Sequence, residues 1–122
     1  ETKLWKEIFT RYSKGAILTG SSAGAIVMGN FQMINIINAF EKDAKPNWVR
    51  GFGLVNWAII PHFDWAIKHD RNKVMNFLKD APNKVGKIAG IDEETAVIVR
   101  DSSEFEVWGK GKIQMFRDNF DS

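Results

Sequence analysis

The stretch AILTGSSAGAIVM, residues 16–28, decides how the rest of this sequence can fold. A short apolar run at 16–18 leads into the glycine-rich segment GSSAG at 20–24, and a second run of small and apolar residues follows at 25–28. Two apolar runs joined by such a corner predict a strand, a tight turn and a helix. The chain is therefore expected to build an α/β fold around this junction.

The corner at 20–24 has the pattern Gly-x-Ser-x-Gly, which in nucleophile elbows places a serine hydroxyl over the edge of a sheet. Ser22 is the serine that fits. Ala23 would begin the helix, where its backbone N–H has no partner within the helix and can bond a developing oxyanion. Gly20 and Gly24 are expected to flank the corner where any Cβ would collide. The same pattern also occurs by chance in ordinary strand-to-helix loops, so the downstream sequence has to decide.

Composition bounds the class of protein. The 122 residues suit one domain, 1–122, and 44% hydrophobic with 26% charged residues is ordinary for a globular chain. A net charge of +2, with basic residues scattered among acidic ones, argues against a nucleic-acid partner. Because there is no cysteine, disulfides, thiolate metal sites and a cysteine nucleophile are excluded. No apolar run is long enough to span a membrane, and we expect a soluble, cytoplasmic protein.

Hydrophobic periodicity predicts alternating helices and strands over most of the chain. The expected elements are helices over 4–12 and 65–78 and strands over 16–18, 54–60 and 87–91. Asp64 stands where it could cap the second helix, and Pro61 closes the strand before it. This order is typical of strand–helix–strand units in a parallel sheet.

Two segments depart from that order. Residues 30–47 combine apolar residues at mixed spacing with the charged run EKDAKPN, which predicts an irregular or short helical insertion near the rim of the site. Towards the C-terminal end, short β runs at 95–100, 105–109 and 112–116 predict antiparallel hairpins or a meander. The expected fold class is an α/β parallel sheet with flanking helices and a C-terminal antiparallel β segment.

Chemically useful side chains follow these elements in the order serine, histidine, acid. Ser22 lies at the elbow, and His62 and the acidic run at 92–94 each follow a predicted strand. Because functional groups gather at the carboxyl ends of parallel strands, these three are expected to converge. A serine hydroxyl needs a base, and an imidazole base needs an acid to fix its tautomer. A packed histidine and a polar turn are the ordinary alternatives, and His69 is expected to be a solvated helix residue.

These residues resemble the peptidase E and cyanophycinase family of serine peptidases. The resemblance rests on three motifs in this order: GSSAGA at 20–25, PHF at 61–63 and GIDEETA at 90–96. It extends from about Trp5 to Phe116, nearly the whole chain. It implies a sheet like that of class I glutamine amidotransferases and a triad in the order serine, histidine, glutamate.

The resemblance also implies a role for each side chain. Ser22 matches the nucleophile, His62 the general base and Glu93 the acid, while Asp92 and Glu94 stay open as alternatives for the acid. The implied reaction is hydrolysis of a peptide bond next to aspartate, with no metal ion and no organic cofactor. Within the family, peptidase E acts on dipeptides with N-terminal aspartate, and cyanophycinase acts on the aspartyl-arginine units of a storage polymer.

One departure from the family pattern concerns substrate choice. Cyanophycinases resemble one another in an Asp-Gln pair before the His-Phe and in several arginines after it, whereas here Ile60-Pro61 precede it and only Lys68 and Arg71 follow. This favours the peptidase E type. Arg71 is a candidate for binding a substrate carboxylate, although a helix-surface arginine is more often simply solvated.

A second departure is length. Family members are about twice as long, and their preceding half supplies the first parallel strands and a glycine-rich loop. We therefore expect these residues to be the C-terminal portion of a longer domain, or one chain of a split protein. An exposed sheet edge then favours pairing with the missing half or self-association. The isolated chain could well be inactive, because the second oxyanion donor would come from that half.

The expected function is a serine-type peptidase acting on small aspartyl peptides. A cyanophycinase-like exopeptidase is the alternative within the family, and a non-catalytic amidotransferase-like binding domain is the alternative outside it. Nucleic-acid binding through Trp48, Arg50 and Trp57 is a third alternative. It is disfavoured because these aromatic residues sit among core-like neighbours and the charge is nearly balanced.

Overall fold

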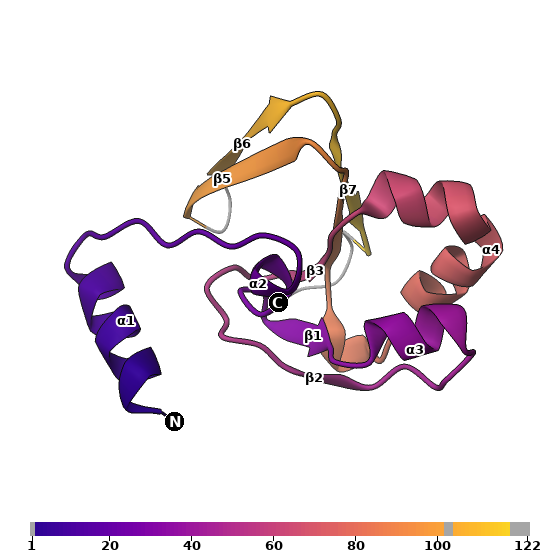
Figure 1. Cartoon of the computed structure of the whole chain (residues 1–122), viewed down its shortest axis with the longest axis horizontal. Coiled ribbons are helices and arrows are strands. Elements are labelled where there is room, and N and C mark those ends of the chain that lie inside the picture. Colours follow the sequence, from indigo (N-terminus) through magenta and orange to yellow (C-terminus); the bar gives the residue numbers. More distant parts are fainter. Residues whose placement is uncertain (1, 102–103, 118–122) are drawn as a thin grey trace.

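A computed structural model describes residues 2–101 and 104–117 (Figure 1). In chain order the elements are α1 (Lys3–Ser13), α2 (Ala23–Ile26), β1 (Phe31–Met33), α3 (Ile36–Glu41), β2 (Trp48–Arg50), β3 (Ala58–Ile60), α4 (Phe63–Asp80), the 3-10 turn η1 (Asn83–Val85), β4 (Ile88–Ile91), β5 (Thr95–Asp101), β6 (Glu104–Gly109) and β7 (Ile113–Phe116). Helices and strands are mixed, and one strand pair is parallel, which confirms the predicted α/β class.

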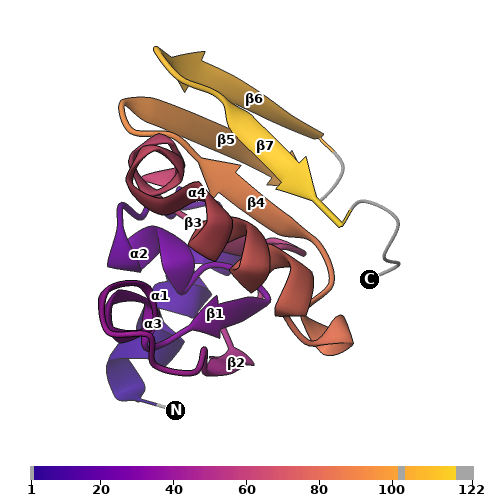
Figure 2. The ribbon, with the colours of Figure 1, turned by 90° about the vertical axis from the view of Figure 1, so that its right-hand side faces the viewer.

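The largest sheet in the described part of the chain has three strands, in the order β3-β4-β7. β3 and β4 are parallel, with Ile59 opposite Ala89, and β7 pairs antiparallel with β4. All of β3 and residues 88–90 of β4 are buried, as expected for strands covered on both faces. α4 connects these two strands and lies across the sheet (Figure 2). The residues that α4 buries are Phe63, Ala66, Val74 and Leu78.

α4 consists of two helical segments that meet at a kink. Asp70 has non-helical backbone angles, φ −157° and ψ 84°, and its Oδ1 accepts the Lys73 N–H at 3.1 Å. Asp70 therefore acts as the cap of the second segment. At the start of the helix, the residue in the N-cap position is His62, and Asp64 lies inside the first turn. The prediction that Asp64 caps this helix is wrong.

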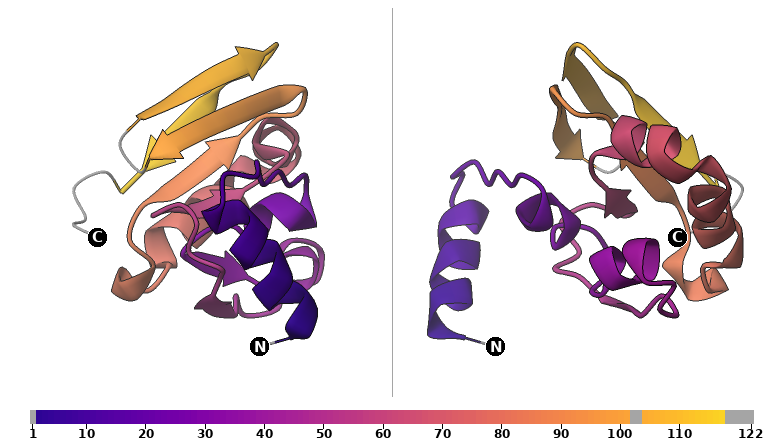
Figure 3. Two further views of the ribbon diagram at one scale, coloured as in Figure 1. Left: turned by 90° about the vertical axis from the view of Figure 1, so that its left-hand side faces the viewer. Right: turned by 45° about the vertical axis from the view of Figure 1, so that its right-hand side comes forward.

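α1 is the amphipathic helix predicted for 4–12, and it lies apart from the rest of the chain (Figure 3). Thr2 caps it, because its side-chain oxygen accepts the Trp5 N–H at 3.0 Å. None of its residues is buried. Trp5 stacks on Phe52 with ring centroids 3.8 Å apart, which ties the helix to the segment after β2. Its apolar face otherwise finds little of this chain to pack against.

The strand predicted for 16–18 does not form. Residues 16–21 have no regular secondary structure, and Ile17 is 90% exposed. A strand needs a neighbour that exchanges backbone hydrogen bonds with it, and no strand in the described part of the chain pairs with this segment. The strand before the elbow is therefore wrong as a prediction, whereas the helix after it, α2, is confirmed.

The remaining β elements differ in part from the predictions. The insertion at 30–47 contains the short helix expected, but β1 also pairs antiparallel with β2, which the mixed spacing did not suggest. Only 58–60 of the strand predicted for 54–60 is regular. β5 and β6 form the expected hairpin, while β7 leaves the meander and joins β4. The aromatic residues Trp48 and Trp57 are buried, so neither ring is free to stack on a base.

Candidate active site

Ser22 occupies a strained corner directly before α2. Its backbone angles, φ 54° and ψ −117°, are unusual for a residue with a side chain and cost about 1–3 kcal/mol. A Cβ on Gly20 would collide with the carbonyl oxygen of Gly24, so this corner requires glycine at position 20. A Cβ on Gly24 would meet nothing within 4 Å, and the prediction of crowding there is wrong. The backbone thus places Ser22 on an elbow.

His62 and Glu93 follow neighbouring parallel strands. β3 ends at Ile60 and β4 ends at Ile91, so both side chains emerge at the same edge of the sheet. His62 has a left-handed backbone, φ 53° and ψ 38°, which turns the chain sharply from strand into helix. In the described ranges, five residues other than glycine have a positive φ, and three of them are Ser22, His62 and Glu94. Backbone strain is therefore concentrated around this edge of the sheet.

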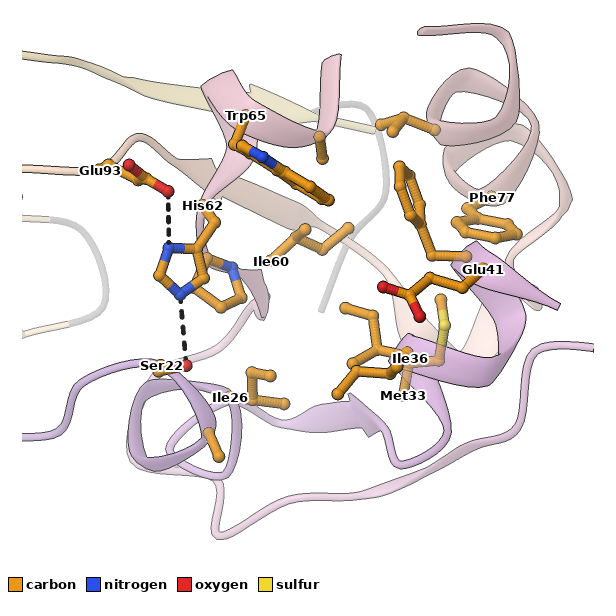
Figure 4. A pocket seen from close by; sticks show the side chains of 16 residues that line it. Ser22, Ile26, Met33, Ile36, Glu41, Ile60, His62, Trp65, Phe77 and Glu93 are labelled. Carbon is orange, nitrogen blue, oxygen red and sulfur yellow. Dashed lines mark hydrogen bonds and ion pairs between the residues drawn. The ribbon is translucent and has the colours of Figure 1, made fainter. Parts of the chain in front are cut away.

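The three side chains predicted as a triad lie in a row (Figure 4). Ser22 Oγ is 3.3 Å from His62 Nε2, and His62 Nδ1 is 3.2 Å from Glu93 Oε1. The imidazole and the carboxylate are about half exposed, with relative side-chain exposures of 52% and 49%. One imidazole nitrogen therefore faces the hydroxyl and the other faces an acid, which is the arrangement that proton transfer from serine requires.

The other two acids of the run at 92–94 have different partners. Asp92 Oδ2 accepts the Lys112 N–H at 3.1 Å, and Glu94 Oε2 pairs with Lys110 Nζ at 3.2 Å. Both contacts tie the turn after β4 to the segment between β6 and β7. Among the three acids, the carboxylate that faces His62 is Glu93.

Asp64 holds the backbone of Glu93 and was missed as a site residue. Its Oδ1 accepts the Glu93 N–H at 2.9 Å, so the first turn of α4 fastens the turn after β4. This hydrogen bond, with smaller contributions from backbone N–H groups of the first turn of α4, lowers the pKa of Asp64 below its usual value. The sequence signal for this residue is an acid two positions after the histidine, which a helix cap explains equally well.

Ala23 is the first residue of α2, and its N–H lies where no partner within the helix can reach it. A backbone N–H directly after the proposed nucleophile is the group that an oxyanion hole uses. Its role as a donor stays a prediction. Ala25 and Ile26 both donate their N–H groups to the Ser22 carbonyl oxygen, so the corner and the short helix form one unit.

A cavity of about 490 Å³ opens beside Ser22 and His62, between α2, α3 and α4. Its walls are mostly apolar, and its far end from the serine lies near Phe77 and Glu41 (Figure 4). The volume is typical of a small-molecule site. Arg71 is exposed on α4 and is not among the residues that line this cavity, so the structure does not place it at the site.

His69 is exposed on α4 but is not simply solvated. Its ring stacks on Trp65, with centroids 4.8 Å apart and an interplanar angle of 11°. It also lies 5.7 Å from the ring of Phe40. These contacts give His69 a packing role beside the cavity and place it away from Ser22.

Comparison with known proteins agrees with this geometry. The model of peptidase family S51 matches residues 1–107. The chain belongs to peptidase family S51. This confirms the resemblance that the three sequence motifs suggested, and it assigns the elbow and the neighbouring strand ends to a family of peptidases.

Two relatives illustrate how much of the S51 fold is present. A cyanophycinase from Geminocystis herdmanii (strain PCC 6308) is 31% identical over 121 residues, which cover 93% of this chain and 41% of that protein. The crystal structure of a peptidase from an acI-B1 actinobacterium superposes with a TM-score of 0.70 at 30% identity, covering 96% of this chain and 46% of that one. This S51 chain therefore spans less than half the length of these relatives.

Within the described ranges, 2–101 and 104–117, no helix combines the length and the hydropathy needed to cross a bilayer. In the same ranges, no three His, Asp or Glu side chains gather in the way that a metal ion would require.

Proposed function

We propose that this chain carries the triad of a serine-type peptidase, with Ser22 as nucleophile, His62 as general base and Glu93 as the orienting acid. The observation that supports this most strongly is the unbroken row from Ser22 Oγ through the imidazole to Glu93 Oε1, with separations of 3.3 and 3.2 Å. Membership in a peptidase family supports the same reaction class.

The proposed reaction has two stages. Ser22 Oγ attacks the carbonyl carbon of the scissile peptide bond while its proton passes to His62 Nε2, and the Ala23 N–H donates to the developing oxyanion. The imidazolium then gives this proton to the leaving amine, the C–N bond breaks, and an acyl-serine ester remains. His62 then takes a proton from a water molecule, which attacks the carbonyl carbon of the ester. The bond from this carbon to Ser22 Oγ breaks, the acid product leaves, and His62 returns the proton to Ser22 Oγ. Throughout, Glu93 accepts a hydrogen bond from Nδ1–H and stabilises the charged ring.

The proposed substrates are small peptides with an aspartyl residue before the scissile bond, as in aspartyl dipeptidases of the peptidase E type. The sequence motifs around the three site residues support this choice. A cyanophycinase-like activity is the second candidate, and the 31% identical relative named as a cyanophycinase supports it.

The two relatives are much longer than the region that this chain matches. Because each is more than twice as long as the matched region, we propose that a further α/β segment, or a second copy of the chain, covers α1 and the segment before the elbow. The exposure of Leu4 (70%) and Ile17 (90%) supports this. Light scattering tests it: a stable monomer that binds little apolar dye would contradict the proposal.

A serine-reactive fluorophosphonate tests the triad directly. We expect the reagent to modify Ser22, and we expect modification to disappear in Ser22→Ala but not in Ser21→Ala, the adjacent matched control. Mass spectrometry of peptides identifies the modified residue. Labelling of any other serine, or equal labelling of both variants, would refute the assignment.

Substrate choice needs hydrolysis measurements on the natural protein that carries this chain. Aspartyl dipeptides should be cleaved by the unaltered protein and not by Ser22→Ala. Cleavage of aspartyl-arginine polymer alone would favour the cyanophycinase-like candidate. Binding of aspartyl peptides without any cleavage or serine labelling would favour a non-catalytic binding domain.

A further inference from the structure

The walls of the cavity beside the triad are mostly apolar. Ile26 and Ile60 lie near the serine, Met33 and Ile36 form one wall, and the rings of Trp65 and Phe77 form the other (Figure 4). Ser22 and His62 border the same cavity at one end, so whatever occupies it lies next to the reacting atoms. The cavity is therefore part of the substrate path rather than a separate hollow.

Its charged groups are carboxylates. Among the described residues that line the cavity, none is lysine or arginine, and the acids are Glu93 beside His62 and Glu41 at the far end. Lys73 lies close by, but its Nζ pairs with Asp43 at 2.7 Å and donates to the Phe40 carbonyl oxygen at 2.7 Å. An aspartyl side chain would enter this cavity against like charge and without a cation to meet it.

The walls are held in place before any ligand binds. Lys73 ties α4 to Phe40 of α3, which lines the cavity, and to Asp43 just after α3. The Trp65 ring is stacked on His69 and lies 5.7 Å from the Phe40 ring, so its orientation is set by packing although the residue is 48% exposed. A preformed apolar cavity is the type of site that selects a large apolar group.

We propose that this cavity binds a large apolar side chain, of the size of leucine or phenylalanine, on the leaving-group side of the scissile bond. The inference rests on the proposed peptidase function, because Ser22 and His62 define where the scissile bond lies. If the aspartyl residue lies on the acyl side, the residue on the leaving-group side is the one that enters this cavity of apolar and acidic groups. The protein thereby selects peptides in which aspartate is followed by an apolar residue.

A binding measurement that needs no catalysis tests this. The chain is labelled with ¹³C at its methionine methyl groups and titrated with N-acetyl-leucinamide, with the α-amide of N-acetyl-aspartate and with N-acetyl-argininamide. Met33 lines the cavity and reports occupancy, while Met115 in β7 is an internal reference. We expect the Met33 signal to shift with the leucine amide at about 10-fold lower concentration than with either other amide, and Met115 to stay unchanged.

Paired variants sharpen the result. Trp65→Ala removes a half-exposed wall and should weaken leucine amide binding by at least about threefold. Trp108→Ala, 63% exposed on β6 and outside the cavity, should leave binding unchanged. A Met33 response that is equal for the three amides, strongest for aspartate or arginine, or absent would overturn the inference.

The cavity's preference for an apolar group and the proposed peptidase function can fail independently. If Met33 responds as expected while no fluorophosphonate modifies Ser22, the peptidase proposal fails and the cavity's preference stands. If Ser22 is modified but Met33 does not distinguish the amides, the reverse holds.

Discussion

The strands that end near His62 and Glu93 are built differently from the segment that leads to Ser22. All of β3 and most of β4 are buried, and α4 covers them, whereas residues 16–21 form no strand and Ile17 is 90% exposed. The positions of His62 and Glu93 therefore depend on contacts that this chain makes by itself. The position of Ser22 depends on a four-residue helix and on a segment that finds no strand partner among the described residues.

This contrast separates two properties that a triad needs. Orientation of the imidazole comes from the sheet and from the Asp64–Glu93 hydrogen bond, both present here. Placement of the serine comes from the strained corner at Ser22, whose cost of about 1–3 kcal/mol must be offset by its surroundings. The orientation of the imidazole should therefore survive changes outside the core, whereas the placement of the serine should be sensitive to them.

The largest expected effect is on chemistry at Ser22. His62→Ala should slow fluorophosphonate modification of Ser22 by about 10³-fold or more, because the hydroxyl loses its base. His69→Ala is the matched control and should leave the rate within a few-fold. A rate that falls in His69→Ala and persists in His62→Ala would reverse the assignment of the base.

The next effect concerns stability and tests the contrast itself. Ile88→Ala, at a fully buried position of β4, should lower the free energy of unfolding by about 2–5 kcal/mol. Ile17→Ala in the exposed segment should change it by no more than about 0.5 kcal/mol. Urea denaturation of both variants measures this. Similar losses in the two would show that the segment before the elbow is packed after all.

Asp64 tests how the acid is positioned. Asp64→Ala removes the acceptor for the Glu93 N–H and should slow modification of Ser22 by about 10-fold, because a misplaced acid orients His62 less well. Asp64→Asn keeps an acceptor oxygen and should retain most of the rate. If alanine and asparagine act alike, the hydrogen bond has no positioning role.

The smallest effect is a pH dependence at the same contact. The pKa of Asp64 is lowered in the folded chain, so the stabilisation from this contact is fully present above the unfolded pKa of about 4 and is lost as pH falls through the lower folded value. The Glu93 amide resonance should titrate with a midpoint below pH ~4. In Asp64→Asn that transition should vanish, and its persistence would point to another group.

Much of the site was predictable because several of its features depend only on residues that are near one another in the sequence. The apolar run before Pro61 and His62 is buried on both faces, and the elbow pattern around Ser22 needs only near neighbours. The strand at 16–18 was not predictable, because an apolar run becomes a strand only where another strand can pair with it. The hydrogen bond from Glu93 to Asp64 joins positions 29 residues apart, and no periodicity reveals such a contact.

The cavity likewise could not be predicted from the sequence pattern. Met33 lies in β1 and Phe77 in α4, yet both line one cavity in the folded chain. The three motifs revealed the family, and the arrangement of apolar side chains around them had to be seen in three dimensions. The apolar preference proposed for the leaving group therefore comes from the cavity, whereas the aspartyl residue on the acyl side comes from the motifs.

A double-mutant cycle on Ser22 reactivity tests most directly whether the three side chains act as one unit. Rates of fluorophosphonate modification are measured for the unaltered chain, His62→Ala, Glu93→Gln and the double variant. Because Glu93 acts only through the imidazole, the double variant should react as slowly as His62→Ala alone, and Glu93→Gln alone should be intermediate. An unchanged rate in Glu93→Gln, or losses that simply multiply in the double variant, would contradict the triad.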